Sequence, residues 1–115
     1  MAPIGLDLDS AWGLISRSMA AWSGQGIEVS PPTWRDRDAP AAPFLTSRDL
    51  VSSPDSLGVR LRKDTREGKL VIFDGGWADL SFVDGASGTT LVEAPDLSDL
   101  EDVSRLLDRF GTLFL

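Results

Sequence analysis

Three carboxylates in the second half of the chain, Asp74, Asp79 and Glu93, are the residues best suited to chemistry. The strand pairing expected below puts Asp74 and Asp79 on one side of a sheet, with Glu93 near them if its strand has the matching orientation. Glycosidases use two carboxylates at a set separation, one of them as the acid. The same side also carries Arg60 and Arg62, and ion pairing across strands is the interpretation that we favour.

Other catalytic groups are scarce in this sequence. It contains no histidine and no cysteine, which removes the commonest general base, the thiolate nucleophile and most transition-metal ligands. A serine–lysine pair needs a buried lysine, whereas Lys63 and Lys69 flank an expected turn. The glycine-containing segment 85–88 connects two strands, while a phosphate-binding loop connects a strand to a helix. We therefore expect a protein that is not an enzyme and that uses no cofactor and no metal.

The size and charge of the chain favour a small binding protein. Its 115 residues suit one domain, residues 1–115, and its net charge of −7 opposes non-specific binding to nucleic acids and anionic membranes. An acidic surface favours a basic partner, although simple solubility is the plainer interpretation. No apolar run approaches the ~20 residues of a membrane span, and residues 1–5 lack a basic signal-peptide start, so we expect a cytoplasmic protein.

A helix is predicted near the start of the chain. Asp9 or Ser10 caps it, because either side-chain oxygen can accept an unpaired backbone N–H group, and Gly24 and Gly26 end it. An apolar stripe at helical spacing is expected to pack in the core, and it consists of Leu8, Trp12, Ile15, Met19 and Trp22.

A second helix is predicted near the C-terminus. Ser98 and Glu101 form a capping box, and we expect the helix to end at Gly111. Its apolar stripe consists of Leu100, Val103, Leu107 and Phe110. The apolar residues 112–115 should pack against the body of the protein.

Between these helices the sequence predicts an antiparallel sheet. A short strand at 26–30 precedes a proline-rich irregular excursion at about 33–56, which is followed by strands at 57–63, 69–74, 77–82 and 89–94. The fold class is therefore α+β: an N-terminal helix, a mostly antiparallel meander sheet of four to five strands, and a C-terminal helix packed on the sheet. The sequence does not determine whether both helices cover the same face.

The glycines of one hairpin predict the register of the sheet. Gly75 and Gly76 suit a two-residue loop, in which Phe73 faces Ala78. With a five-residue loop at 64–68, the expected core side consists of Val59, Leu61, Val71, Phe73, Ala78, Leu80 and Phe82. The opposite side then carries Arg60, Arg62, Leu70, Ile72, Asp74, Trp77, Asp79 and Ser81.

Two tryptophans are candidates for contact with a partner protein. In this register Trp77 projects from the polar side beside Asp79, and a tryptophan offers a large contact area with few rotatable bonds. Trp34, after a pair of prolines, is the second candidate. The competing interpretation is that a helix or the excursion covers these rings. With Asp74, Asp79 and Glu93, the two tryptophans form the predicted partner-binding set.

The sequence resembles the small immunity proteins of bacterial polymorphic toxin systems, and it is most similar to the TriTu type. The similar parts are the first helix, segment 26–30 (GIEVS), segment 68–80 (GKLVIFDGGWADL), the turn with Asp84, Ser87 and Gly88, and segment 106–110 (LLDRF). Phe73 stands where a tryptophan is expected, and residues 35–56 lie outside the resemblance. It implies a cytoplasmic antidote that binds and blocks a toxin domain, and it assigns no contact residues.

The partner implied by this resemblance is a cognate toxin protein, and a basic toxin such as a nuclease would suit the charge. A small acidic secretion chaperone or adaptor is the first alternative, because such proteins are also small and acidic. A carboxylate-based small enzyme is the second. The identity of the toxin and the oligomeric state are not determined by the sequence.

Overall fold

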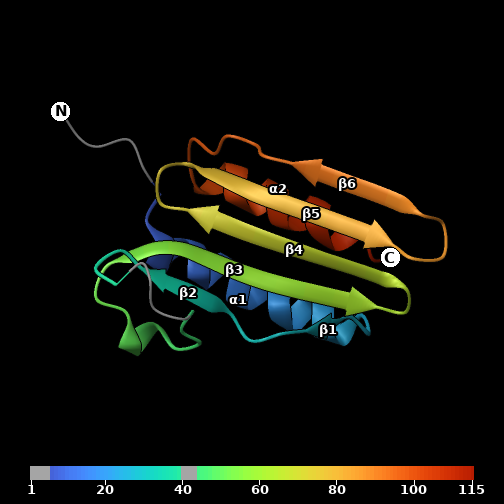
Figure 1. Cartoon of the computed structure of the whole chain (residues 1–115), viewed down its shortest axis with the longest axis horizontal. Coiled ribbons are helices and arrows are strands. Elements are labelled where there is room, and N and C mark those ends of the chain that lie inside the picture. The colour runs from blue at the N-terminus through green and yellow to red at the C-terminus, as the bar shows by residue number, and fades with distance from the viewer. Residues whose placement is uncertain (1–5, 40–43) are drawn as a thin grey trace.

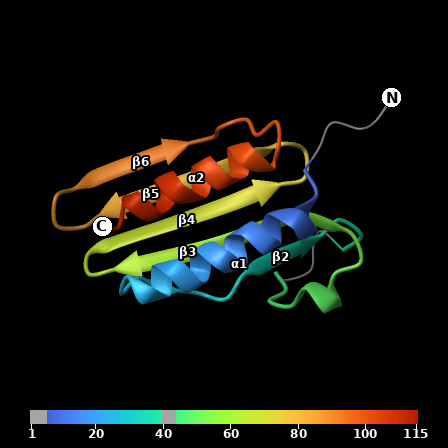
Figure 2. The same ribbon diagram turned by 180° about the vertical axis from the view of Figure 1, so that it is seen from behind.

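The protein is a two-layer structure, with a sheet on one side and two helices on the other. The computed structural model describes residues 6–39 and 44–115, so the first five residues and the middle of the excursion lie outside the described residues. Figure 1 shows the antiparallel sheet, and Figure 2 shows both helices on the same face of it. The predicted α+β fold is confirmed.

The sheet has six strands in the described part of the chain. Their bounds are β1 Glu28–Val29, β2 Thr33–Asp36, β3 Pro54–Lys63, β4 Arg66–Phe73, β5 Trp77–Asp84 and β6 Thr89–Glu93. Helix α1 spans Leu8–Gly24, the short 3₁₀ helix η1 spans Arg48–Leu50, and helix α2 spans Leu100–Thr112. The strand order is β1-β3-β4-β5-β6, and β2 also pairs with β3.

The excursion at 33–56 is more ordered than the sequence predicts. It contains β2 and η1, and its last three residues already belong to β3. The backbone groups of Trp34 and Leu45 form two hydrogen bonds, 2.6 and 2.9 Å long. The Trp34 ring packs edge-on against Trp12 of α1, with 6.1 Å between ring centroids. Burial of this indole therefore fixes a segment whose prolines and charges suggested irregular structure.

The register of the β4–β5 hairpin differs from the prediction by one residue. The loop has three residues, 74–76, so Phe73 pairs with Trp77 and not with Ala78. Of the two loop glycines only Gly76 has a positive φ, at 93°, and its N–H donates to the carbonyl oxygen of Phe73 at 3.1 Å. A shift of one residue moves each side chain of a strand to the other face.

The β3–β4 loop is also shorter than predicted. It consists of residues 64–65, with Asp64 in the left-handed conformation at φ 54°. As a result, Leu70 and Ile72 are buried under the helices, whereas Val71 and Phe73 lie on the opposite face. The other predicted core residues are confirmed, namely Val59, Leu61, Ala78, Leu80 and Phe82.

Helix α1 begins earlier than predicted, because its cap lies two or three residues before the expected one. Asp7 caps it by accepting the N–H of Asp9 at 3.1 Å, so neither Asp9 nor Ser10 is the cap. Its end is confirmed, because the last helical residue is Gly24 and Gly26 has a φ of 80°. Leu8, Ile15 and Trp22 of the predicted apolar stripe are buried, whereas Trp12 and Met19 are partly buried against the core.

Helix α2 also differs from the prediction at both ends. Its cap is Asp99, which accepts the N–H of Asp102 at 2.9 Å, and not Ser98. Gly111 does not end the helix but lies inside it, against Trp22 of α1. A Cβ atom at Gly111 would lie 2.3 Å from the Trp22 Nε1 atom, so the absence of a side chain permits the close approach of the two helices.

Candidate interaction surface

The face of the sheet opposite the helices is not covered by any of the described elements, and we call it the open face (Figure 1). Strands β3 to β6 alternate their side chains between this face and the core. On the open face lie Arg60, Arg62, Glu67, Lys69, Val71, Phe73, Trp77, Asp79, Ser81, Val83, Thr90 and Val92. Two of its aliphatic side chains are well exposed, Val92 at 76% and Val83 at 42%.

An aromatic pair marks one end of the open face. The rings of Phe73 and Trp77 are stacked, with 4.0 Å between centroids and 8° between planes. Trp77 is 39% exposed, which agrees with its expected place on the polar side of the sheet. Asp79 is exposed on the same face and pairs in register with Val71. This end thus combines an accessible aromatic surface with a free carboxylate side chain that no described cation approaches within ion-pair distance.

The sequence did not identify Phe73 and Val71 as surface residues. Segment 70–73 is apolar at every position, so its own pattern fits burial of either face. The signal that could have placed them is the hairpin length, because three-residue loops with a left-handed glycine are also common. The neighbouring Asp74 would then have been assigned to the loop.

A shallow groove of about 410 Å³ crosses β3 to β6 at the other end of the open face. Its charged lining residues are Arg60, Arg62, Lys69 and Glu67. Arg62 and Glu67 pair in register, with 3.6 Å between Nε and Oε1. Arg60 and Lys69 also pair in register, which places two positive charges side by side on adjacent strands. The groove therefore carries an excess of positive charge on a chain whose net charge is −7.

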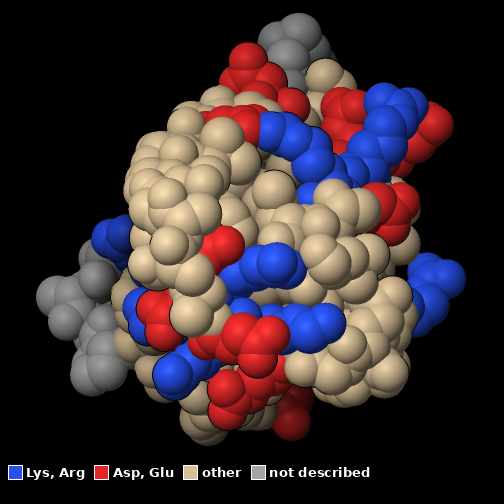
Figure 3. Space-filling view, turned by 90° about the vertical axis from the view of Figure 1, so that its right-hand side faces the viewer, with Lys and Arg blue, Asp and Glu red and all other residues tan. Residues whose placement is uncertain are grey.

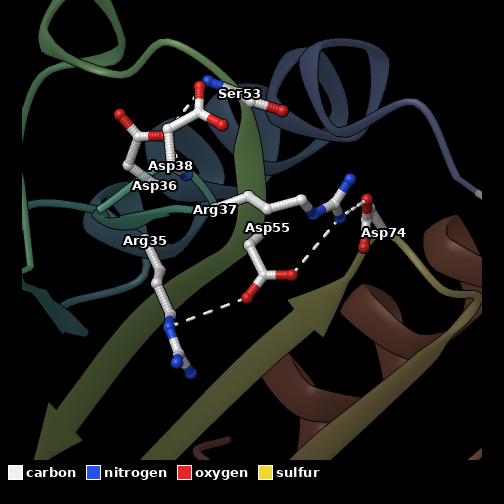
Figure 4. Close-up of polar contacts among 7 residues, drawn as sticks. All are labelled: Arg35, Asp36, Arg37, Asp38, Ser53, Asp55 and Asp74. Carbon is white, nitrogen blue, oxygen red and sulfur yellow. Dashed lines mark hydrogen bonds and ion pairs between the residues drawn. The ribbon is translucent and has the colours of Figure 1, made fainter. Parts of the chain in front are cut away.

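An ion-pair cluster connects β2, β3 and the β4–β5 loop beside the aromatic pair (Figure 4). The guanidinium of Arg37 donates to Asp74 and, at 3.3 Å, to Asp55. These hydrogen bonds, that to Asp74 first, raise the pKa of Arg37 above its ordinary value. The Nε atom of Arg35 lies 3.6 Å from Asp55. Asp74 is therefore engaged in linking segments of the fold, although it was predicted as a partner contact.

A neighbouring carboxylate, Asp36, anchors the excursion from inside. Its side chain is 9% exposed and accepts backbone N–H groups from Ser52 at 2.9 Å, Asp38 at 3.0 Å and Ser53 at 3.2 Å. These hydrogen bonds, with that from Ser52 the strongest cause, lower the pKa of Asp36. The Asp36 carboxylate thus accepts backbone N–H groups that carbonyl oxygens of a neighbouring strand would accept in a regular sheet.

The three carboxylates considered for catalysis are not brought together. Asp74 pairs with Arg37, Asp79 lies on the open face, and Glu93 pairs with Arg109 of α2 on the helix side of the sheet. Two acids flanking one substrate bond is the arrangement that glycoside hydrolysis needs. Within residues 6–39 and 44–115, no group of three or more acidic side chains is placed to hold a metal ion.

Trp34, the second predicted partner contact, is a core residue. It is 1% exposed, between Trp12 and the backbone of β3, with the guanidinium of Arg48 5.7 Å from its ring centroid. Arg48 in turn donates to Asp9 of α1 at 2.6 Å, and this bond lowers the pKa of Asp9. Of the predicted partner-binding set, only Trp77 and Asp79 are therefore exposed on the open face.

Charges of both signs are intermixed at the end of the molecule where the β3–β4 and β5–β6 turns lie (Figure 3). Ion pairs such as Arg66–Asp84, at 3.6 Å, belong to this end. Surface ion pairs of this kind contribute little stability. They do balance the local charge at this end, whereas Arg60 and Lys69 of the groove have no such balancing carboxylate among the described residues.

The comparisons with known proteins found no relative of this chain. No protein-family model matches the chain, and neither a curated protein nor a solved structure is significantly similar to it. In the part of the chain that the structure describes, neither helix has the length and apolar character needed to cross a bilayer.

Proposed function

We propose that this protein is an immunity protein that neutralises a bacterial toxin domain by stoichiometric binding, with the open face of its sheet as the contact surface. The class of partner follows from the sequence resemblance to polymorphic-toxin immunity proteins. The observation that carries the choice of surface is the uncovered sheet face with its stacked Phe73–Trp77 pair. A chain without histidine and cysteine is better suited to binding than to turnover.

The open face is large enough for this role. Strands β3 to β6 have ten, eight, eight and five residues, and together they cover roughly 500 Å² of flat area. A typical stable complex buries about 800 Å² on each partner. The open face supplies most of such a surface, and side chains of the flanking loops supply the remainder.

The aromatic end of this face is the expected anchor. Binding energy concentrates in large side chains that become fully desolvated in the complex, with tryptophan among the most frequent. Trp77 is already held by Phe73, so its binding costs little side-chain entropy. Asp79 beside it, and the net charge of −7, favour a basic toxin such as a nuclease and accelerate its encounter. The antidote would act in the cytoplasm.

The test is a binding and growth assay with the toxin domain encoded next to this gene. We expect a one-to-one complex with sub-micromolar affinity and rescue of cells that express the toxin. Trp77→Ala should weaken the complex at least tenfold, because it removes the anchor. Arg17→Ala, an exposed change on α1 in the other layer, is the matched control and should leave the affinity unchanged.

Two results would contradict the proposal. One is the absence of any complex at micromolar concentration. The other is a complex with the export segment of a secreted protein that leaves its toxic domain active, which is the behaviour of the chaperone alternative. A complex that is insensitive to Trp77→Ala would exclude the aromatic end of the open face as the anchor.

A further inference from the structure

Among the described residues of the open face, one pair of cations has no acidic partner. Arg60 and Lys69 lie directly opposite each other on β3 and β4, and like charges in this position destabilise a sheet. Within the described residues, neither side chain forms an ion pair or a side-chain hydrogen bond to a carboxylate. Arg60 is exposed and Lys69 is half-buried.

The neighbouring cations on the same strands differ from this pair, because each of them has an oxygen partner. Arg62 faces Glu67 across the strands, and Arg66 faces Asp84, in both cases with 3.6 Å between the charged atoms. Lys63 lies opposite Arg66, but its Nζ donates to the carbonyl oxygen of Gln25 at 3.4 Å. Each of these side chains has an oxygen partner within the fold, so the unmatched pair is local to the groove.

The groove provides the other contacts that an extended acidic segment would need. Hydroxyl groups of Ser30, Ser81 and Thr90 line it, together with the aliphatic side chains of Val83 and Val92. Its one acidic lining residue, Glu67, is engaged by Arg62. The side chain of Arg60 therefore adjoins hydrogen-bond donors and apolar surface, and carboxylate groups are the natural complement of such a lining.

We propose that this groove binds a carboxylate-bearing segment of the partner protein, with Arg60 and Lys69 as the binding cations. This inference rests on the proposed function, because the segment is taken to belong to the toxin. The open, four-strand groove suits an extended peptide rather than an enclosed small molecule. The net charge of −7 opposes long-range attraction of an acidic chain, so the pair determines orientation in the complex more than the rate of encounter.

The test is an NMR titration of the ¹⁵N-labelled protein with N-acetylated hexaglutamate amide at low ionic strength. We expect shifts confined to amides of β3 to β6 that line the groove, and their loss at high salt. The double variant Arg60→Ala/Lys69→Ala should weaken binding at least tenfold. Arg17→Ala/Arg105→Ala removes the same charge from the helices and should change the affinity less than twofold.

Thermal unfolding of the free double variant separates binding from structure. Removal of two unmatched like charges should leave the unfolding midpoint unchanged or higher, whereas a structural role would lower it. The proposal is overturned if hexaglutamate shifts no groove amide at millimolar concentration, or shifts them equally in the double variant. Tighter binding of oligothymidylate or of inorganic phosphate would also overturn it, because the ligand would then not be a carboxylate segment.

These outcomes are independent of the toxin assay. The peptide titration can fail while a toxin complex that depends on Trp77 forms, which would remove only the role of the groove. Conversely, the groove can bind hexaglutamate while no toxin complex exists, which would remove the proposed function and leave an acidic-segment site.

Discussion

The indole of Trp77 lies flat on the phenyl ring of Phe73, on the face of the sheet that the helices leave uncovered. The two residues are direct cross-strand neighbours at the two ends of a three-residue loop. Such a stacked pair holds a large apolar surface in one orientation before any partner arrives. Its position distinguishes Trp77 from Trp34, which has the same side chain but lies in the core.

The stability of alanine variants should separate these two tryptophans. Trp34→Ala removes a fully buried indole and should lower the free energy of unfolding by about 3–5 kcal/mol. Trp77→Ala loses a stacking contact at an exposed site and should cost about 1 kcal/mol. Urea denaturation followed by circular dichroism measures both. Equal losses in the two variants would contradict the assignment of Trp77 to the surface.

The contact between the helices at Gly111 makes a second prediction. Gly111→Ala gains about 1 kcal/mol in helix propensity, but its methyl group would collide with the indole of Trp22. We expect a net destabilisation of about 1–2 kcal/mol from the overpacking, measured by thermal or urea unfolding. Gly13→Ala is the control, because Gly13 lies in α1 with no atom within 4 Å of the added methyl position, and it should be stabilising.

Acid should unfold the protein partly through Asp36. Its pKa in the folded state is lowered from the ordinary value of 3.8, so its carboxylate stabilises the fold above that pH. The contribution is lost as the pH falls below 3.8 and through the lower pKa of the folded state. Asp36→Asn should therefore be less stable at neutral pH and should lose less stability on acidification.

Urea midpoints measured between about pH 2 and pH 6 test this prediction. Asp9 and Asp84 also have lowered pKa values, so the variant should retain part of the acid sensitivity. Asp108→Asn, an exposed change on α2, should reproduce the wild-type profile. An Asp36→Asn profile that parallels the wild type would show that this carboxylate does not contribute.

The start of helix α2 provides a further test. Asp99 caps the helix, whereas Ser98 contributes only its backbone N–H, which donates to Asp102 at 2.8 Å. Asp99→Ala should lower the free energy of unfolding by about 1 kcal/mol. Ser98→Ala should be close to neutral, because no hydrogen bond of its hydroxyl stabilises the helix. A larger loss of stability in Ser98→Ala than in Asp99→Ala would instead support the capping box predicted from the sequence.

The candidate site was only partly predictable from the sequence. Trp77 and Asp79 lie on the open face as expected, because β5 alternates so regularly that either loop length gives it the same two faces. The face on which Glu93 lies depends on the orientation of β6, which the β5–β6 turn determines. The burial of Trp34 depends on the pairing of β2 with β3, which the preceding prolines obscured in the sequence. The Arg60–Lys69 pair requires the register of β3 against β4, which no single segment contains.

By itself, the sequence determined the features that depend on local pattern. The two amphipathic helices follow from their apolar spacing, and the faces of β5 follow from its alternation. Tertiary structure alone decided the faces of β4. Residues 70–73 are apolar throughout, so the hydrophobic effect would be satisfied locally by burial of either Leu70 and Ile72 or Val71 and Phe73. Only the packing of both hairpins against the helices selects Leu70 and Ile72 for the core.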